Sequence, residues 1–281
     1  MPENNKPNNE RPADLAVQDS VGGMARRLLN PAHLRDLAGR SVKTLREQGA
    51  EQLWRDVKFR VGLAMHHDDW RHRADIPLRR ELKAQRAAHL QGPKISIIVP
   101  LYNTPAKLFD EMLQSVVKQT YTNWELVLVD ASDADKRLES RLPKAVPGTI
   151  VYEPIENGGI ALNTTRGFAL AHGEYITLLD HDDVLYPNAL FEVVQTIQNT
   201  GANFVYSDEI VLSADLKELG GYHFKPDFAP DYLRGVNFIT HLAVFSRPLL
   251  DAAGAYESKE FDGAQDHDLI LRLTEKAHRI E

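Results

Sequence analysis

Three carboxylates stand within four residues at Asp180, Asp182 and Asp183, directly after an apolar run that begins at Tyr175. Carboxylates crowded in this way repel one another unless a cation, a proton or a hydrogen-bond donor lies among them. Oxygen ligands of this kind suit a hard divalent ion such as magnesium or manganese. Asp180 and Asp182 are therefore candidate metal ligands, and an ion held there could neutralise a diphosphate leaving group. The alternative is an acidic surface turn in which Asp183 caps a helix.

The pattern of an apolar strand followed by an acid occurs twice more, at Asp130 and at Asp208. In open α/β sheets, ligands bind beyond the carboxyl ends of the strands. Three strand-end acids therefore predict one acidic, cation-dependent pocket. Asp130 could accept hydrogen bonds from a nucleobase or a ribose, and the alternative for this residue alone is a helix cap or a loop acid.

Two turns next to these strands could contact a ligand. The first, Pro100-Leu101-Tyr102-Asn103, ends a predicted strand where backbone N–H groups could reach an anion or a base. The second, Asn157-Gly158-Gly159, is followed by Asn163, and its glycines permit close approach of the backbone to a ligand. A simple loop that leads into a helix is the alternative for this second turn.

Asp266 lies in an acidic segment, residues 262–268, at the start of the last predicted helix. A carboxylate there could act as a general base that activates a hydroxyl nucleophile. Because helix N-termini favour carboxylates in any case, helix capping is the alternative.

The elements that must position these side chains alternate between strands and helices from Lys94 onward. This alternation predicts βαβ units and a mixed, mostly parallel sheet flanked by helices, which is an α/β fold. The predicted strands cover residues 95–99, 124–130, 149–152, 175–180, 204–206 and 241–246, and the predicted helices begin near residues 104, 160, 187 and 266.

The N-terminal part of the chain has a different character. Residues 1–20 are rich in Asn, Pro, Glu and Asp and are predicted to be a disordered tail. Residues 21–92 carry apolar stripes at helical spacing and predict a helical region before the α/β domain of residues 93–281. Basic residues outnumber acidic ones in this helical region, which could therefore face an anionic membrane or form a solvated helical surface.

Composition excludes several classes of function. The chain has no cysteine, which rules out disulfides, thiolate zinc sites and cysteine nucleophiles, and a cytoplasmic location is expected. Acidic residues outnumber basic ones in residues 93–281, so binding of nucleic acid by charge is not expected. No apolar run approaches the ~18 residues that a membrane span needs. The glycine-rich motifs of dinucleotide-binding and P-loop proteins are also missing.

Taken together, residues 94–281 resemble a family 2 glycosyltransferase of the GT-A fold. A later part of this stretch resembles rhamnosyltransferases and relatives that build bacterial surface polysaccharides. The segments that carry the general resemblance are Ile97 to Asn103, Leu128 to Ser132, Asn157 to Gly167, Leu178 to Leu185 and Gln265 to Leu269. The segments that carry the narrower one are Tyr206-Ser207-Asp208-Glu209, Phe224-Lys225-Pro226-Asp227 and His241-Leu242-Ala243-Val244.

The resemblance implies a role for each matching residue. Asp180 would contact the ribose or the metal, and Asp182 would coordinate a manganese or magnesium ion on the diphosphate. Asp266 would be the catalytic base of a single displacement that inverts the anomeric carbon. The residues expected to bind the nucleotide sugar are Pro100, Tyr102, Asn103, Asp130, Asn157, Gly159, Asn163 and Asp180.

The expected function is transfer of a sugar from a nucleotide-diphosphate donor to a hydroxyl of a growing cell-surface glycan, which could be lipid-linked. The basic helical region would place the protein at the inner face of the cytoplasmic membrane. Members of the family usually carry a metal-binding histidine after the catalytic acid, and no residue after Asp266 clearly matches it, so a chain shorter than the complete enzyme is expected. The alternatives are a sugar nucleotidyltransferase and a non-catalytic module that binds nucleotide sugars.

Overall fold

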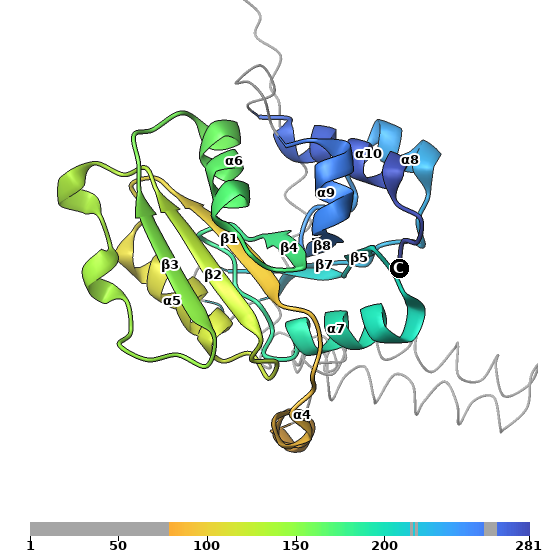
Figure 1. The fold of residues 1–281 in the computed structure, drawn as a ribbon, viewed down its shortest axis with the longest axis horizontal. Coiled ribbons are helices and arrows are strands. Elements are labelled where there is room, and N and C mark those ends of the chain that lie inside the picture. The colour runs from red at the N-terminus through yellow and green to blue at the C-terminus, as the bar shows by residue number, and fades with distance from the viewer. Residues whose placement is uncertain (1–78, 214–215, 217–218, 256–262) are drawn as a thin grey trace, which may run out of the picture. The chain divides into compact units, whose positions relative to one another are not determined.

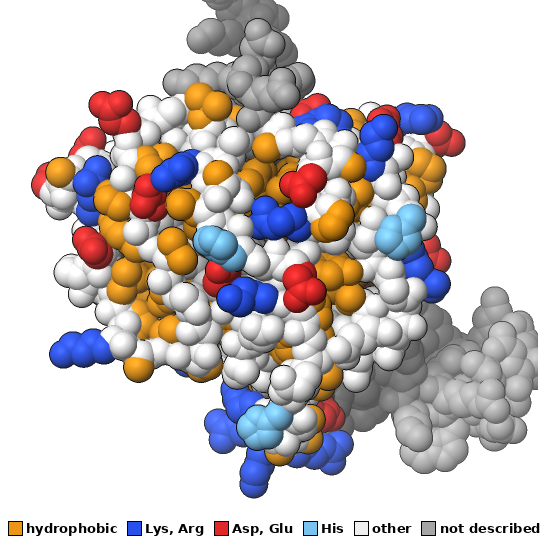
Figure 2. Space-filling model, in the orientation of Figure 1, with side chains coloured by type: hydrophobic (Ala, Val, Ile, Leu, Met, Phe, Trp, Pro, Cys, Tyr) orange, Lys and Arg blue, Asp and Glu red, His pale blue; other side chains and the backbone are white. Residues whose placement is uncertain are grey.

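The computed structural model describes residues 79–213, 216, 219–255 and 263–281. All of them belong to the second of two compact units, Arg73–Glu281. The predicted tail and most of the predicted helical region therefore lie outside the described residues. The part of that region which is described contains helix α4, Arg79–Ala88, around which Lys and Arg side chains gather (Figure 2).

The centre of the described unit is a six-stranded sheet with the strand order β3-β2-β1-β4-β8-β5 (Figure 1). Strands β3, β2, β1 and β4 are parallel, whereas β8 is antiparallel to both of its neighbours. This arrangement confirms the predicted mixed, mostly parallel α/β sheet. The strands are β1 Ile95–Leu101, β2 Trp124–Asp130, β3 Thr149–Pro154, β4 Tyr175–Leu178, β5 Phe204–Tyr206 and β8 Ala243–Ser246.

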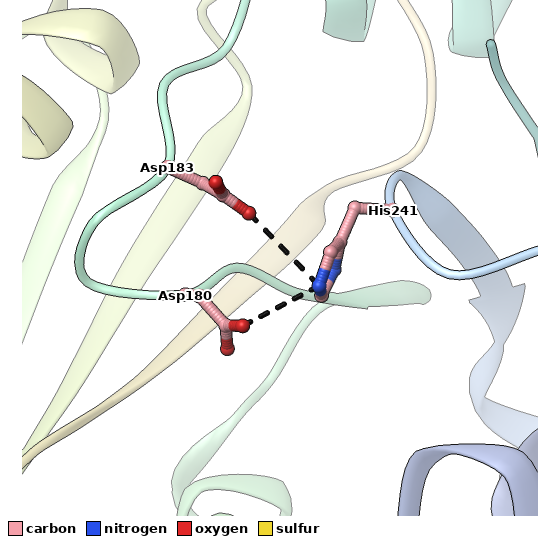
Figure 3. Close-up of side chains that lie close together, drawn as sticks. All are labelled: Asp180, Asp183 and His241. Atoms are coloured by element: carbon pink, nitrogen blue, oxygen red, sulfur yellow. Dashed lines mark ion pairs between the residues drawn. The ribbon is translucent and has the colours of Figure 1, made fainter. Parts of the chain in front are cut away.

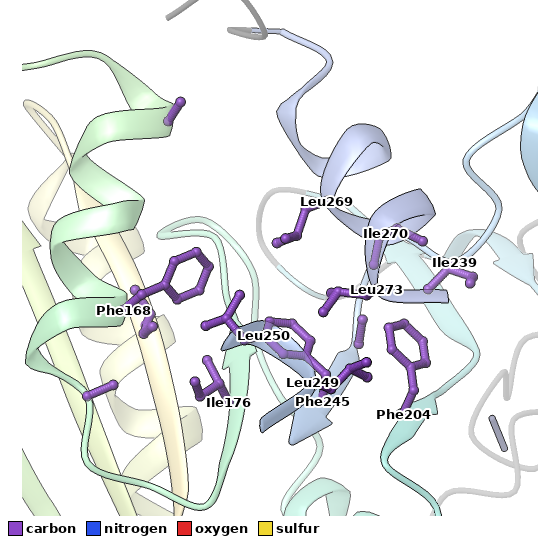
Figure 4. Packing of buried hydrophobic residues seen from close by; sticks show 14 of the residues in the cluster. Phe168, Ile176, Phe204, Ile239, Phe245, Leu249, Leu250, Leu269, Ile270 and Leu273 are labelled. Carbon is purple, nitrogen blue, oxygen red and sulfur yellow. The ribbon is translucent and has the colours of Figure 1, made fainter. Parts of the chain in front are cut away.

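Helices cover both faces of the sheet, because side chains of the central strands alternate between two apolar clusters. Ile97 of β1 packs in one cluster with side chains of α5 (Ala106–Val117) and α7 (Ala189–Thr200). Its neighbour Ile98 packs in the other with side chains of α6 (Ile160–Leu170), α9 (Arg247–Ala253) and α10 (Gln265–Lys276). Figure 4 shows this second cluster, in which Phe168, Phe245 and Leu269 lie between the helices and the sheet.

Helix α6 lies unusually close to the sheet at Gly167. A Cβ atom at this position would come within 2.3 Å of the Ile98 Cγ2 atom. The glycine therefore sets the distance between the helix and β1, and with it the position of the residues at the start of α6.

A small hairpin interrupts the main fold between β5 and β8. It consists of β6 (Glu209–Leu212) and β7 (Leu219–His223), which form a separate antiparallel sheet, and it is followed by the short helix α8 (Pro230–Gly235). The sequence did not predict these elements. Two short 3₁₀ helices, Ala134–Lys136 and Glu139–Arg141, lie between β2 and β3. No helix in the described part of the chain has both the length and the apolarity to cross a bilayer.

Candidate metal and catalytic site

A cavity of about 390 Å³ lies beyond the carboxyl end of β4. Its lining combines acids, histidines and amides with apolar side chains. The polar lining residues include Asp180, Asp182, Asn237, Thr240, His241, Gln265 and Asp266, and the apolar ones include Pro100, Ile160, Leu178, Phe245, Leu269 and Ile270.

Asp180, Asp183 and His241 form a group whose ligand atoms all lie within 4.8 Å of one another. The Nε2 atom of His241 is 3.4 Å from Asp180 Oδ2 and 3.9 Å from Asp183 Oδ2 (Figure 3). The two acids belong to one turn after β4, which is closed by a hydrogen bond from the Asp183 backbone N–H to the Asp180 carbonyl at 3.2 Å. Two carboxylates and an imidazole converging in this way could hold a divalent metal ion.

The antiparallel direction of β8 brings His241 to this turn. Thr177 of β4 pairs with Val244 of β8, so the residues that precede β8 lie beside those that follow β4. The sequence predicted a strand from residue 241 and sought a metal-binding histidine after Asp266. The histidine that joins the acids is instead His241, which precedes Asp266 in the chain. The signal that could have found it is the segment His241 to Val244, which carries the narrower family resemblance but was given no role for its histidine.

The charges of this group are coupled. The hydrogen bond with Asp180 raises the pKa of His241 above its ordinary value, while burial opposes the shift. The same hydrogen bond lowers the pKa of Asp180. Burial is the main cause that raises the pKa of Asp183, and the neighbouring carboxylates add to it. A bound cation would offset both the cost of burying these carboxylates in their charged form and the repulsion between them.

Asp266 borders the same cavity from the first turn of α10. Its negative charge is among the lesser causes that raise the pKa of His241, which lines the same cavity. His267 Nε2 lies 2.6 Å from the Leu233 carbonyl oxygen, which ties the first turn of α10 to α8. The structure therefore places the predicted catalytic acid at the same cavity as Asp180 and His241.

Asp182, the other predicted metal ligand, also lines the cavity, but it does not belong to the group of converging ligand atoms. Asp183, which the sequence suggested as a helix cap, is the second carboxylate of that group. Of the three strand ends with an acid, only the one at β4 contributes carboxylates to the cavity.

Asp130 is completely buried at the end of β2. Its carboxylate accepts hydrogen bonds from the Ser132 backbone N–H at 3.0 Å and from the Tyr152 hydroxyl at 2.5 Å. Asn103, with φ of 50°, donates its backbone N–H to Ser132 Oγ at 2.8 Å. Tyr102 beside it is 53% exposed. Asp130 thus shapes the loop next to these residues, and direct contact of Asp130, Tyr102 or Asn103 with a nucleotide stays a prediction.

Asn157, Gly159 and Asn163 form the turn into α6. Asn157 Oδ1 accepts hydrogen bonds from the Gly159 N–H at 3.0 Å and from Asn163 Nδ2 at 3.1 Å. Gly159 has φ of 93°, a conformation that residues with a Cβ rarely adopt. Because the turn ends at Ile160, which lines the cavity, these residues place the start of α6 at the site. Their contact with a nucleotide sugar also stays a prediction.

The sequence model described as "Glycosyl transferase family 2" matches residues 96–250, which are more than half of this chain. The chain belongs to this glycosyltransferase family. The matched range contains Asp180, Asp183 and His241 but ends before Asp266.

Two curated relatives of this glycosyltransferase chain illustrate the similarity. "Uncharacterized protein y4gI" of Sinorhizobium fredii is 40% identical over 193 residues, which cover 66% of this chain and 21% of that protein. "O-antigen biosynthesis protein RfbC" of Myxococcus xanthus is 34% identical over 192 residues, which cover 67% of this chain and 15% of that protein. The chain therefore spans only a small part of the length of these relatives.

Among solved structures, the crystal structure of S. aureus TarS 1–349 superposes with a TM-score of 0.55 at 22% identity, covering 66% of this chain and 57% of that one. The same TarS fragment in complex with UDP gives a TM-score of 0.56, and in complex with UDP-GlcNAc a TM-score of 0.54. This similarity confirms the GT-A fold that the sequence predicted.

Proposed function

We propose that this chain carries a glycosyltransferase active site that transfers a sugar from a nucleotide-diphosphate donor to a hydroxyl group of a growing bacterial glycan. The observation that carries the proposal is that Asp180, His241 and Asp266 line one cavity at the carboxyl edge of the sheet, where Asp183 converges with Asp180 and His241. Membership of the family supports the reaction class. The O-antigen relative and the TarS complexes with UDP and UDP-GlcNAc support the glycan acceptor and the nucleotide-sugar donor.

Asp180, Asp183 and His241 would hold the divalent ion. The donor set fits manganese, which accepts carboxylate oxygens together with an imidazole, and its oxygens also suit magnesium. An ion bound there supplies positive charge against the diphosphate of the donor. Asp182, exposed on the same turn, is proposed as a further ligand of the ion or its water.

Asp266 would act as the general base. Its carboxylate would take the proton of the acceptor hydroxyl as the hydroxyl oxygen bonds to the anomeric carbon and the bond from that carbon to the diphosphate breaks. One displacement of this kind inverts the anomeric centre and needs no covalent intermediate with the enzyme. The first turn of α10 keeps Asp266 in place through the contact of His267 with α8.

The apolar lining residues of the cavity would contribute to binding by excluding water from the reacting groups. Leu269 and Ile270 follow Asp266 on α10 and line the cavity together with Phe245. A donor sugar bound there would therefore contact both acidic and apolar side chains of the cavity.

Isothermal titration calorimetry tests the proposal with a panel of nucleoside diphosphates, with and without manganese. Binding that requires the ion is expected, and binding that is indifferent to it would contradict the metal site. Analysis of the products separates the alternatives. Release of a nucleoside diphosphate identifies a glycosyltransferase, whereas release of pyrophosphate identifies a nucleotidyltransferase and the absence of turnover points to a non-catalytic module.

The proposed acceptor is a glycan that could be lipid-linked, and the proposed location is the inner face of the cytoplasmic membrane. The support for the membrane contact is the basic character of residues 21–92, including the basic side chains on α4 (Figure 2). Sedimentation with liposomes tests this contact. Equal binding to anionic and neutral lipid would remove it.

A further inference from the structure

A lysine is buried beneath the segment that carries His241. The side chain of Lys225, which follows β7, is only 1% exposed. Its Nζ atom donates to the Ile239 carbonyl oxygen at 2.5 Å and to the His241 carbonyl oxygen, and it lies 3.5 Å from Glu209 Oε2. Lysine side chains are almost never fully buried unless they are paired. The burial of Lys225 therefore indicates that its charge and its hydrogen bonds are needed at this position.

Glu209 binds Thr240, the residue between Ile239 and His241 in the chain. Its Oε2 atom accepts a hydrogen bond from Thr240 Oγ1 at 2.9 Å, and its Oε1 atom lies 2.5 Å from His223 Nδ1. Glu209 and His223 are directly paired across the hairpin of β6 and β7. The segment 239–241 is thus bound at three consecutive residues, by one ammonium group and one carboxylate.

The backbone of this segment needs such support. Thr240 has φ of 36°, and a β-branched residue with positive φ is a rare and unfavourable conformation. Strain of this kind persists only where the surroundings enforce it, and it is concentrated at functional sites. Thr240 and His241 both line the cavity, so the strained backbone lies at the site itself.

We propose that Lys225 and Glu209 are positioning residues, which fix the backbone around His241 so that its imidazole faces Asp180 and Asp183. The inference rests on the proposed function, since it assigns a role to residues around the same metal site.

The proposal also gives a role to the hairpin of β6 and β7, which carries Glu209 and leads into Lys225. Asp208 Oδ1 accepts a hydrogen bond from the Lys225 backbone N–H at 2.7 Å, and the Ser207 backbone N–H donates to the Leu242 carbonyl oxygen at 3.1 Å.

These contacts join three segments that stand apart in the sequence. The segments 206–209, 224–227 and 241–244 carried the narrower family resemblance without a role for most of their residues. In the structure, the first two provide the carboxylate and the ammonium group, and the third provides the histidine that they position.

The test is the substitution Lys225→Met, which keeps the length of the side chain and removes its charge and donors. Residues that orient metal ligands typically change metal affinity by about 10–100-fold when they are mutated. We therefore expect the Kd for Mn²⁺, measured by calorimetry on the folded metal-free protein, to rise by about that factor. An unchanged Kd in a wild-type protein that binds Mn²⁺ would overturn the inference and leave the proposed function standing.

Arg247→Met is the matched control. Arg247 also donates to backbone carbonyl groups, those of Ala171 and Gly173, but it follows β8 at the end opposite to His241. Its loss should lower the melting temperature without changing the Kd for Mn²⁺. If both variants weakened Mn²⁺ binding equally, the effect of Lys225 would reflect general stability and the inference would fail.

A second readout does not depend on metal. In protein labelled with ¹⁵N at histidine, the imidazole signals of His241, assigned with His241→Gln, report the contact with Asp180. We expect Lys225→Met to shift these signals and Arg247→Met to leave them unchanged. Unshifted signals in Lys225→Met would overturn the inference even if the wild-type protein bound no Mn²⁺, a result that would contradict the proposed metal site separately.

The double variant Lys225→Met/Glu209→Gln tests whether the two residues act together. Residues in one network show non-additive effects. The double variant should therefore weaken Mn²⁺ binding by much less than the product of the two single effects. Multiplicative effects would show that Lys225 and Glu209 act independently and would contradict a shared positioning role.

Discussion

The Nε2 atom of His241 lies 3.4 Å from Oδ2 of Asp180, although one residue precedes strand β8 and the other follows strand β4. The contact exists because β8 runs antiparallel to β4, so the start of one strand lies beside the end of the other. It also sets the charge of the site, since each partner stabilises the ionised form of the other. The two side chains form an ion pair when His241 is protonated, whereas binding a metal ion would require the deprotonated imidazole.

Replacement of His241 by glutamine should weaken the binding of Mn²⁺. Even residues that only orient a ligand change metal affinity by about 10–100-fold, so the loss of a ligand should raise the Kd by at least that factor. Calorimetric titration of the metal-free protein with MnCl₂ measures the effect. His278→Gln is the control, because His278 lies near the Gly201 carbonyl group, at 3.2 Å, and does not line the cavity. Equal affinity of wild type and His241→Gln would exclude His241 as a ligand.

The stability of the metal-free protein should depend on pH through the same pair. The folded-state pKa of His241 is raised above its ordinary value of 6.5, so its contribution is complete below pH 6.5 and is lost as the pH rises through the raised pKa. The pKa of Asp180 is lowered from 3.8, so its contribution is present above pH 3.8 and is lost as the pH falls through the lowered pKa. The pair therefore stabilises the fold most between these two limits.

Thermal unfolding of the metal-free protein over a series of pH values measures this dependence. The melting temperature of the wild type should fall more steeply above pH 6.5 than that of His241→Gln. Mn²⁺ should bind more tightly over the same rise in pH, because metal ligands must be deprotonated. If the two proteins showed parallel curves of melting temperature against pH, the ion pair would not contribute to stability.

Much of the fold could be predicted from local sequence patterns. Strand β2 (Trp124–Asp130) and strand β5 (Phe204–Tyr206) have the bounds that the apolar runs predict, and α6 and α10 begin within a residue of their predicted starts. The two strands are short, mostly apolar runs, α6 follows Gly159, and α10 begins in an acidic segment, so their local sequence alone indicates them. The predicted cluster of acids after β4 is also where the cavity lies.

The direction of β8 and the hairpin could not be predicted in the same way. The local pattern of a strand does not show whether it runs parallel or antiparallel, which depends on the connection from the preceding strand. Strand β7 contains Gly220 and Gly221, which are uncommon in strands, so its sequence does not resemble one. His241 and Lys225 acquire their neighbours only through these two features, which explains why neither was expected at the proposed metal site.

Substitution of Gly167 by alanine should destabilise the protein. Within a helix this change would normally be favourable, but here the added Cβ would lie 2.3 Å from Ile98 Cγ2 and 3.3 Å from Val129 Cγ2. Overpacking of this kind costs about 1–3 kcal/mol, since α6 must move away from the sheet. Urea denaturation measures the change in the free energy of unfolding.

Gly235→Ala is the control for this prediction, because a Cβ at Gly235 would have no neighbour within 4 Å. Its free energy of unfolding should stay close to that of the wild type. Equal stability of Gly167→Ala and the wild type would show that the spacing between α6 and β1 is not fixed by the glycine.

Replacement of Asp266 by asparagine should abolish most of the turnover and leave donor binding intact. General bases typically contribute about 10²–10⁴-fold to the rate, so kcat should fall by that factor while the calorimetric Kd for the nucleoside diphosphate with Mn²⁺ stays the same. Glu275→Gln, at an exposed position on the same helix, should change neither quantity. Because asparagine keeps the size of the side chain and one acceptor oxygen, a loss of kcat alone would identify the carboxylate as the group that accepts the proton. A variant with wild-type kcat would instead require another base, and a variant that lost donor binding would place Asp266 in the donor site.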